Sequence, residues 1–273
     1  MNEEIIDNTI SAAPTDFEPI VENIPEENTD GVVSDSLVQK EAPDKKSEKT
    51  TALLYLMFAF IALIAIYVVQ FFHYLEPLFS DVHQGDFTSI FFYCFNIAFW
   101  IPAIAALAIC IKKFTGYNVF HKGTSEIPLK RSLIIYALVA VPIFVVSAIL
   151  GFELKVVFEL GTKLSAAQVA TNGVMYVHGA VKLVLGMMII ELVQEAFEKL
   201  FKFKYCEWIP WGGIVLALTF GFLEVIVTSH TAFIPNTFMW LYIGFDLIYG
   251  IIYVIAKKNA FVAYFTSLIL FIL

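Results

Sequence analysis

The sequence has 273 residues, of which 59% are hydrophobic and 15% are charged, and its formal net charge is -8. A water-soluble domain needs roughly a quarter of its residues charged to face water, so the composition excludes an ordinary soluble fold. The acidity is local, because residues 1–50 hold thirteen of the 25 Asp/Glu but four of the 17 Lys/Arg. The sequence contains no basic patch with interleaved aromatic residues, which argues against a nucleic-acid partner.

The first segment, residues 1–50, mixes Asp, Glu, Pro, Ser and Thr with isolated Ile and Val. It sustains no helical or strand period and cannot bury enough apolar area to offset chain entropy. We therefore expect a disordered acidic tail, followed by a transmembrane domain over residues 51–273. Because the first apolar run starts only after this tail, we expect no cleaved signal peptide.

Long apolar runs alternate with short polar loops from Thr51 onward. Most runs hold about 20 residues, enough to cross ~30 Å of hydrocarbon at 1.5 Å per residue. Lipid tolerates only helices or closed barrels, and the runs lack the period-2 alternation of barrel strands. The predicted fold is all-α, a polytopic membrane helical bundle with about seven transmembrane helices near residues 51–72, 88–111, 132–152, 172–195, 209–229, 237–256 and 259–273.

The distribution of Lys and Arg predicts the orientation of this bundle. With the tail inside, only Lys155 and Lys163 fall in the opposite loops. We therefore predict a multi-pass protein of a bacterial cell membrane, in contact with the lipid bilayer, with a cytoplasmic N-terminus and an external C-terminus. The residues that share the tail's side are Lys45, Lys46, Lys49, Lys112, Lys113, Lys122, Lys130, Arg131, Lys199, Lys202, Lys204, Lys257 and Lys258.

Ionisable residues inside the predicted spans are concentrated in the C-terminal half. Each costs about 2.5–3.5 kcal/mol on insertion scales and therefore requires a reason. At 100° per residue Glu191 and Glu195 share a helix face, whereas Lys182 points away from Glu191. One pocket cannot easily hold the whole set, which is His178, Lys182, Glu191, Glu195, Glu224 and Asp246.

Two stretches of this half resemble an intramembrane protease family. Gln194-Glu195-x-x-x-Lys199 resembles the E-E-x-x-x-R motif of the CAAX-protease and bacteriocin-processing (CPBP) family. About twenty residues further on, Phe220-x-x-x-Glu224 is similar to the F-x-x-x-E motif of the related PrsW-type proteases.

Two further stretches extend the resemblance over about residues 172–273. Asp246-x-x-x-Gly250 is similar to the H-x-x-x-G motif of PrsW-type members, with Asp in the His position, and Ser267 stands where the last family helix has a His. The resemblance implies the family's helical arrangement and, in an active member, a glutamic-type intramembrane endopeptidase. The candidate catalytic residues are Glu191, Glu195, Glu224 and Asp246.

The leading functional hypothesis is a divergent intramembrane-protease-like protein with weak or absent peptidase activity. The family uses Glu and His to activate water, and both His positions are replaced here. Such a protein could still bind membrane-protein or peptide partners in the inherited cavity. We expect no cofactor and no metal, because the sequence has no Walker A, Rossmann or H-E-x-x-H pattern and no His or Cys cluster.

Two other functions are compatible with the same residues. The first is a transporter or permease component that uses Lys182, Glu224 and Asp246 as a polar path. The second is a membrane scaffold whose acidic tail recruits a partner, with Lys182 and Glu224 as an inert structural ion pair. A shared cavity that joins Glu195, Glu224 and Asp246 would favour the protease-like hypothesis over both.

Overall fold

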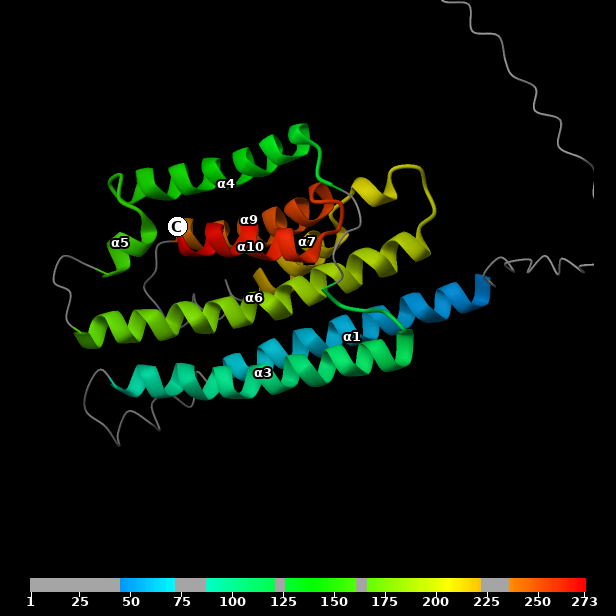
Figure 1. The fold of residues 1–273 in the computed structure, drawn as a ribbon, viewed down its shortest axis with the longest axis horizontal. Helices are drawn as coiled ribbons and strands as arrows, with labels where there is room; N and C mark the ends of the chain where they lie inside the picture. Colours follow the sequence, from blue (N-terminus) through cyan, green and yellow to red (C-terminus); the bar gives the residue numbers. More distant parts are fainter. Residues whose placement is uncertain (1–44, 72–86, 121–125, 161–165, 222–235) are drawn as a thin grey trace, which may run out of the picture. The chain divides into compact units, whose positions relative to one another are not determined.

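The residues described by the computed structural model form helices and the turns between them (Figure 1). The described ranges are 45–71, 87–120, 126–160, 166–221 and 236–273, and all belong to one unit, Ala42–Leu273. The all-α prediction is confirmed for these ranges. The predicted tail up to residue 44 and the candidate Glu224 lie outside them, and the first helix already begins at Lys45.

Four helices are long and apolar enough to cross a membrane, as a multi-pass membrane protein requires. They coincide with the first four predicted spans. The longest has 35 residues, so at 1.5 Å per residue it extends well beyond a ~30 Å hydrocarbon core. The four helices are α1 Lys45–Phe71, α3 Phe87–Thr115, α4 Leu129–Ile149 and α6 Ala166–Leu200.

The last three predicted spans correspond to shorter apolar helices, so the structure does not show seven full spans among the residues it describes. The fifth is interrupted, because α7 passes into a single π-helical turn, η3, just before residues that are not described. These elements are α7 Trp211–Leu216, η3 Ala217–Gly221, α9 Asn236–Ile255 and α10 Ala260–Ile272. Two short helices were not predicted from the sequence, α5 Lys155–Leu160 and η2 Cys206–Trp208.

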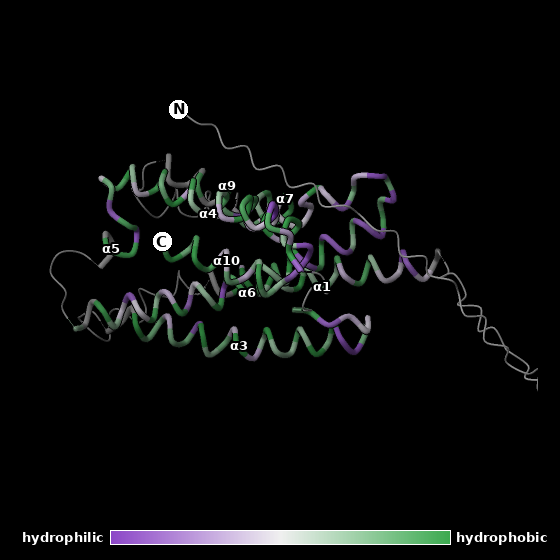
Figure 2. Tube along the Cα trace, turned by 45° about the horizontal axis from the view of Figure 1, so that its top comes forward, coloured by the Kyte–Doolittle hydropathy of each residue, from purple (hydrophilic) through white to green (hydrophobic). Residues whose placement is uncertain are grey.

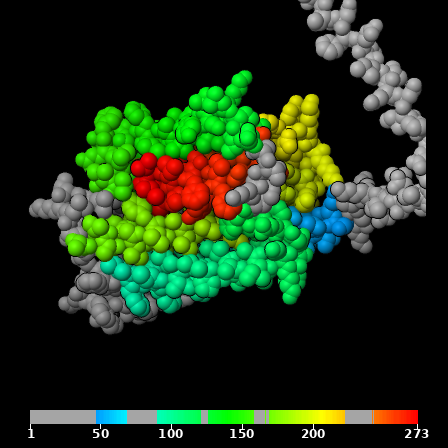
Figure 3. All heavy atoms as spheres, in the orientation of Figure 1, coloured from blue at the N-terminus to red at the C-terminus, as the bar shows by residue number. Residues whose placement is uncertain are grey.

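Helix α6 lies at the centre of the helix packing. Helices α1 and α3 pack on it and on each other, and α7 and α10 also contact it. Met188 and Leu192 of α6 are completely buried as a result. Helix α4 packs on α9 and α10, and Figure 3 shows α10 between α4 and α6 on one face of the molecule.

The outer surfaces of these helices are apolar. Phe60 of α1, Phe91 of α3 and Tyr136 of α4 are each more than half exposed. Figure 2 shows hydrophobic residues along most of the helix lengths and hydrophilic ones mainly toward the helix ends. Such surfaces are stable against lipid, because the backbone hydrogen bonds are satisfied within each helix. Contact with the bilayer therefore accounts for the apolar exterior.

Glycines bring α7 unusually close to two neighbouring helices. A Cβ added to Gly250 of α9 would lie 2.3 Å from the Cα of Gly213 of α7. A Cβ added to Gly212 would lie 2.2 Å from the carbonyl oxygen of Ile190 on α6. Because no side chain fits at these positions, the three backbones pack in direct contact, as small residues allow in membrane helices.

Basic side chains interact with neighbouring residues at one end of this bundle. Lys202 forms an ion pair with Glu48 of α1. The guanidinium of Arg131 lies 4.9 Å from the ring centroid of Trp208. The ammonium of Lys257, in the turn between α9 and α10, donates to the carbonyl of Glu126. We call this the basic end of the bundle, and its placement on the cytoplasmic side stays a prediction.

Candidate functional site

Glu191 is completely buried in α6, and its carboxylate is bound by the segment that follows α3. The hydroxyl of Tyr117 donates to Oε1 at 2.8 Å, and the backbone N–H of Phe120 donates to Oε2 at 3.2 Å. This segment leaves α3 at Gly116, whose φ of +71° is the left-handed conformation that glycine adopts without strain. Glu191 therefore fastens residues 116–120 to α6.

Glu195 and Glu198 share a single ammonium group. The Nζ of Lys258 lies 3.2 Å from Oε1 of Glu195 and also forms an ion pair with Oε2 of Glu198. The exposed fractions of the three side chains are 29%, 20% and 18%. The group is thus partly withdrawn from water, where an ion pair is stronger than at a fully exposed surface.

A turn with unusual backbone geometry aims Lys258 at these carboxylates. Lys257 and Lys258 both have positive φ, +55° and +61°, a conformation that costs an ordinary L-residue about 1–2 kcal/mol. The N–H of Lys258 caps α9 by donating to the carbonyl of Tyr253, and the side chain of Asn259 caps the start of α10. These hydrogen bonds fix the turn, so the Lys258 side chain is held toward Glu195 and Glu198.

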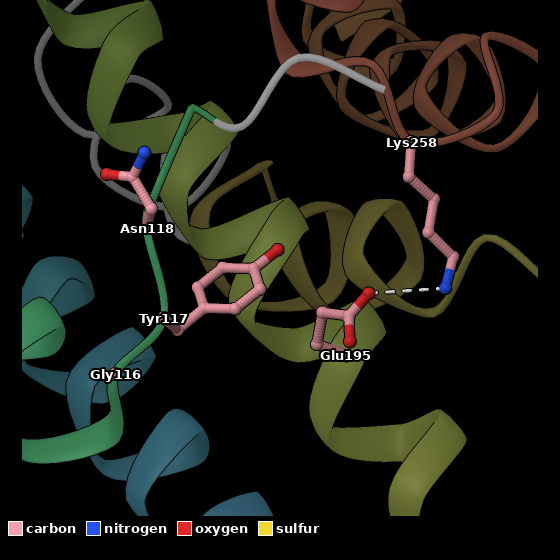
Figure 4. A pocket seen from close by; sticks show the side chains of 5 residues that line it. All are labelled: Gly116, Tyr117, Asn118, Glu195 and Lys258. Atoms are coloured by element: carbon pink, nitrogen blue, oxygen red, sulfur yellow. Dashed lines mark hydrogen bonds and ion pairs between the residues drawn. The ribbon is translucent and has the colours of Figure 1, made fainter. Parts of the chain in front are cut away.

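A pocket of about 340 Å³ opens beside this ion pair (Figure 4). Its lining residues come from the segment after α3, from α6 and from the α9–α10 turn, and Figure 4 shows the Tyr117 ring and the Lys258 side chain on opposite sides of Glu195. We call it the Glu195 pocket. It is lined by Gly116, Tyr117, Asn118, Glu195 and Lys258.

The protonation of two lining groups follows from their surroundings. Burial, followed by the nearby Tyr253 and the Glu191 carboxylate, raises the pKa of the Tyr117 hydroxyl, which therefore stays a donor. Burial lowers the pKa of the Lys258 ammonium, but Glu195 and Glu198 outweigh it and leave that pKa above its ordinary value. Lys258 is consequently charged, and Glu195 shares this cationic partner with Glu198.

Gln194, where the resemblance expects a Glu, is a structural amide. Its Nε2 donates to Oε1 of Glu198 at 2.8 Å and to the carbonyl of Ile209 at 3.0 Å, while its Oε1 accepts from the N–H of Gly212. The side chain is 1% exposed. A carboxylate here would face two acceptors at hydrogen-bond distance, so the packing of α6 against α7 selects glutamine.

Lys182 and Asp246 lie against the π-turn η3, which contributes no residue to the lining of the Glu195 pocket. The Lys182 ammonium lies 4.3 Å from the ring centroid of Phe220. Asp246 is 7% exposed, and a Cβ added to Gly221 would lie 2.9 Å from its Oδ2. Ser267 on α10 is completely buried. Lys182 and Glu191 contact different neighbours.

His178 lies in an aromatic environment between α3 and α6. Its ring stacks on Trp100 with a centroid distance of 4.7 Å, and it lies 5.0 Å from the Tyr93 ring. Over the described part of the chain, no group of three or more His, Cys, Asp or Glu side chains could hold a metal ion. The lining of the Glu195 pocket includes no histidine.

The structure brings together only part of the predicted set. Glu195 lines the pocket, and Glu191 is linked to the pocket by its hydrogen bond with the lining residue Tyr117. Asp246 is not a lining residue, since it lies nine residues before the end of α9, about 13 Å along the helix axis. Glu224 lies outside the described residues, so the cavity expected to join Glu195, Glu224 and Asp246 is not shown.

Sequence reasoning missed four lining residues as site residues, which are Gly116, Tyr117, Asn118 and Lys258. Tyr117 and Asn118 stand in a short polar loop that carries no periodic signal. Lys258 was interpreted only as one of the basic residues that indicate the orientation of the helices in the membrane. The one available signal was the surplus of carboxylates on one face of α6, which requires a basic or donor partner in the fold.

Comparison of the chain with protein families, with characterised proteins and with solved structures finds no match.

Proposed function

We propose that this chain is a divergent CPBP/PrsW-like membrane protein that binds a peptide or membrane-protein segment and hydrolyses it weakly or not at all. The observation that supports the proposal best is the Glu195 pocket, because the glutamate of the first motif lines an open cavity while its carboxylate is bound to Lys258. A carboxylate held in this way is suited to binding a polar group of a ligand.

The chemistry of the lining residues argues against efficient hydrolysis. Peptide hydrolysis needs a general base near the working pH and a group that polarises the carbonyl, each worth about 10²-fold or more. Glu195 is bound to Lys258, and Gln194 has both of its amide hydrogens engaged in structural bonds. Neither side chain is placed to activate water.

The proposal includes the finer topology expected from the sequence. The chain crosses the membrane seven times, the basic end and the tail face the cytoplasm, and the C-terminus is external. Labelling of single cysteines with a membrane-impermeant reagent, one at Ser34 and one in a C-terminal extension, tests this arrangement. Labelling of both from the same side would contradict it.

A second candidate function is supported by one observation. Lys182 and Asp246 both contact the π-turn η3, at Phe220 and Gly221. π-helical turns recur at functional sites, and paired ionisable residues inside a membrane mark ion or substrate paths. A transporter or permease component with its polar path at η3 is therefore the alternative proposal, and ion-flux measurements on Lys182→Met in vesicles would test it.

The leading proposal is tested by incubating the purified protein with transmembrane and prenylated peptides at several pH values. We expect saturable binding and intact peptides by mass spectrometry. Robust cleavage that Glu195→Ala or Glu224→Ala abolishes would refute the proposal and establish a protease. The absence of binding to every peptide would refute it as well.

A further inference from the structure

We infer that the Glu195 pocket takes the ammonium or guanidinium group of a lysine or arginine that flanks a transmembrane helix of the bound segment. This inference rests on the proposed function and names the group that its pocket selects.

The charge balance favours a cation. Glu195 and Glu198 share the single ammonium of Lys258, so the group holds one more carboxylate than ammonium. The bond from Lys258 reaches Oε1 of Glu195, and among the described residues no donor is bonded to Oε2. An incoming ammonium or guanidinium can therefore bind Glu195 through a charge-assisted hydrogen bond.

The end of α3 adds to this preference. Helix α3 ends at Thr115, immediately before the lining residue Gly116. The C-terminal end of a helix carries partial negative charge, which stabilises a nearby cation.

The position of the pocket matches that of flanking basic residues. Glu195 lies five residues before the end of α6 at Leu200, about 7 Å along the helix axis. With the basic end at the cytoplasmic surface, as proposed above, the pocket lies near the level where hydrocarbon gives way to headgroups. Lys and Arg that flank transmembrane helices extend to this level. Its volume of about 340 Å³ accommodates one long basic side chain.

Lys258 competes with such a ligand for the Glu195 carboxylate. Its ammonium occupies the carboxylate that the ligand's cation requires, so a bound lysine or arginine must share Glu195 with it or displace it. Removing the Lys258 ammonium should consequently strengthen binding of the basic ligand. If the ion pair only maintained the structure of the pocket, its removal would weaken binding instead. Asn is the suitable replacement, because it tolerates the positive φ of this position.

The test measures binding of fluorescent transmembrane peptides to the full-length protein in nanodiscs, by anisotropy. One peptide carries two lysines at the end that faces the basic end of the bundle, and its control carries two glutamines there. We expect the lysine peptide to bind about tenfold more tightly or better, the effect of one hydrogen bond to a charged group. Glu195→Gln should abolish this preference and Lys258→Asn should increase it. Glu207→Gln, which removes an exposed carboxylate outside the pocket, should leave it unchanged.

The outcomes separate this inference from the proposed function. Equal binding of both peptides, or a preference that survives Glu195→Gln in a variant with wild-type thermal stability, would overturn the inference and leave peptide binding intact. Failure of both peptides to bind would overturn the inference and the proposed function together. Spermidine, which offers the same cation without a helix, should bind far more weakly, and equal affinity would overturn the assignment to a flanked helix.

Discussion

Replacing Gly250 by alanine should destabilise the helix bundle, because α7 and α9 touch at this residue. The added Cβ would lie 2.3 Å from the Cα and 2.5 Å from the N of Gly213, whereas ordinary van der Waals contact begins at 3.4 Å. Both obstructing atoms belong to the backbone and cannot rotate away. The two helices must therefore separate by about 1 Å, the difference between these distances, or lose their register.

The expected loss is the difference between two opposing effects. Overpacking of a well-packed interior costs about 1–3 kcal/mol, and more where backbone has to move. Alanine gains about 0.5–1 kcal/mol over glycine inside a helix. We expect a net loss near 2 kcal/mol. Gly244, on the same helix, is the matched control, because a Cβ there meets no atom within 4 Å in the part of the chain that the structure describes.

Thermal unfolding in detergent, followed by tryptophan fluorescence, compares the two variants directly. Gly250→Ala should lower the midpoint clearly, while Gly244→Ala should leave it unchanged or raise it slightly. Equal midpoints for the two variants would refute the close contact of α7 and α9. The reverse order would show that the helices cross at Gly244.

Three further predictions concern the site. Gln194→Glu restores the glutamate of the family motif, but it should lower the free energy of unfolding by about 2–4 kcal/mol, because the buried carboxylate would face acceptors. It should also create no peptidase activity. Thermal unfolding and peptide assays measure the two effects, and a stable, active variant would contradict the structural role of the Gln194 amide. Tyr117→Phe should lower the free energy of unfolding by about 1–3 kcal/mol and speed proteolysis of the segment after α3, since the Glu191 carboxylate loses a hydrogen-bond donor. An unchanged proteolysis rate would contradict the role of Tyr117 in holding this segment against α6. The raised pKa of Lys258 means that its contribution is complete below the unfolded lysine pKa of about 10.4 and is lost as pH rises through the folded value. The stability difference between wild type and Lys258→Asn should consequently stay constant from about pH 7 to 9.5 and shrink above about pH 10.5, and a difference that shrinks already near pH 8 would contradict the ion pair.

The sequence was sufficient to predict the long helices but not the short ones. Apolar runs such as those of α1 and α4 are set by the thickness of the membrane, so their position follows from composition alone. The π-turn η3 and the short helix α7 depend instead on glycine contacts with α6 and α9, which join residues far apart in the chain. Hydropathy carries no information about such contacts.

The candidate site was predictable only in part, for a related reason. The shared face of Glu191 and Glu195 follows from helical geometry, and the structure agrees with it. Their partners Tyr117 and Lys258 come from turns with positive φ at Gly116 and at Lys258 itself. Nothing in the local sequence marks a lysine as adopting that conformation, because tertiary contacts impose it.

We expect a membrane peptide to bind at the Glu195 pocket and to remain uncut there. Photo-cross-linking tests this expectation directly, with a photoreactive residue at Asn118 on the pocket rim and, as a matched control, at Tyr205, which is exposed outside the pocket. The lysine-flanked peptide should cross-link from position 118 only and be recovered intact, as judged by mass spectrometry. Equal cross-linking from both positions, or peptide fragments that disappear in Glu195→Ala, would contradict this expectation.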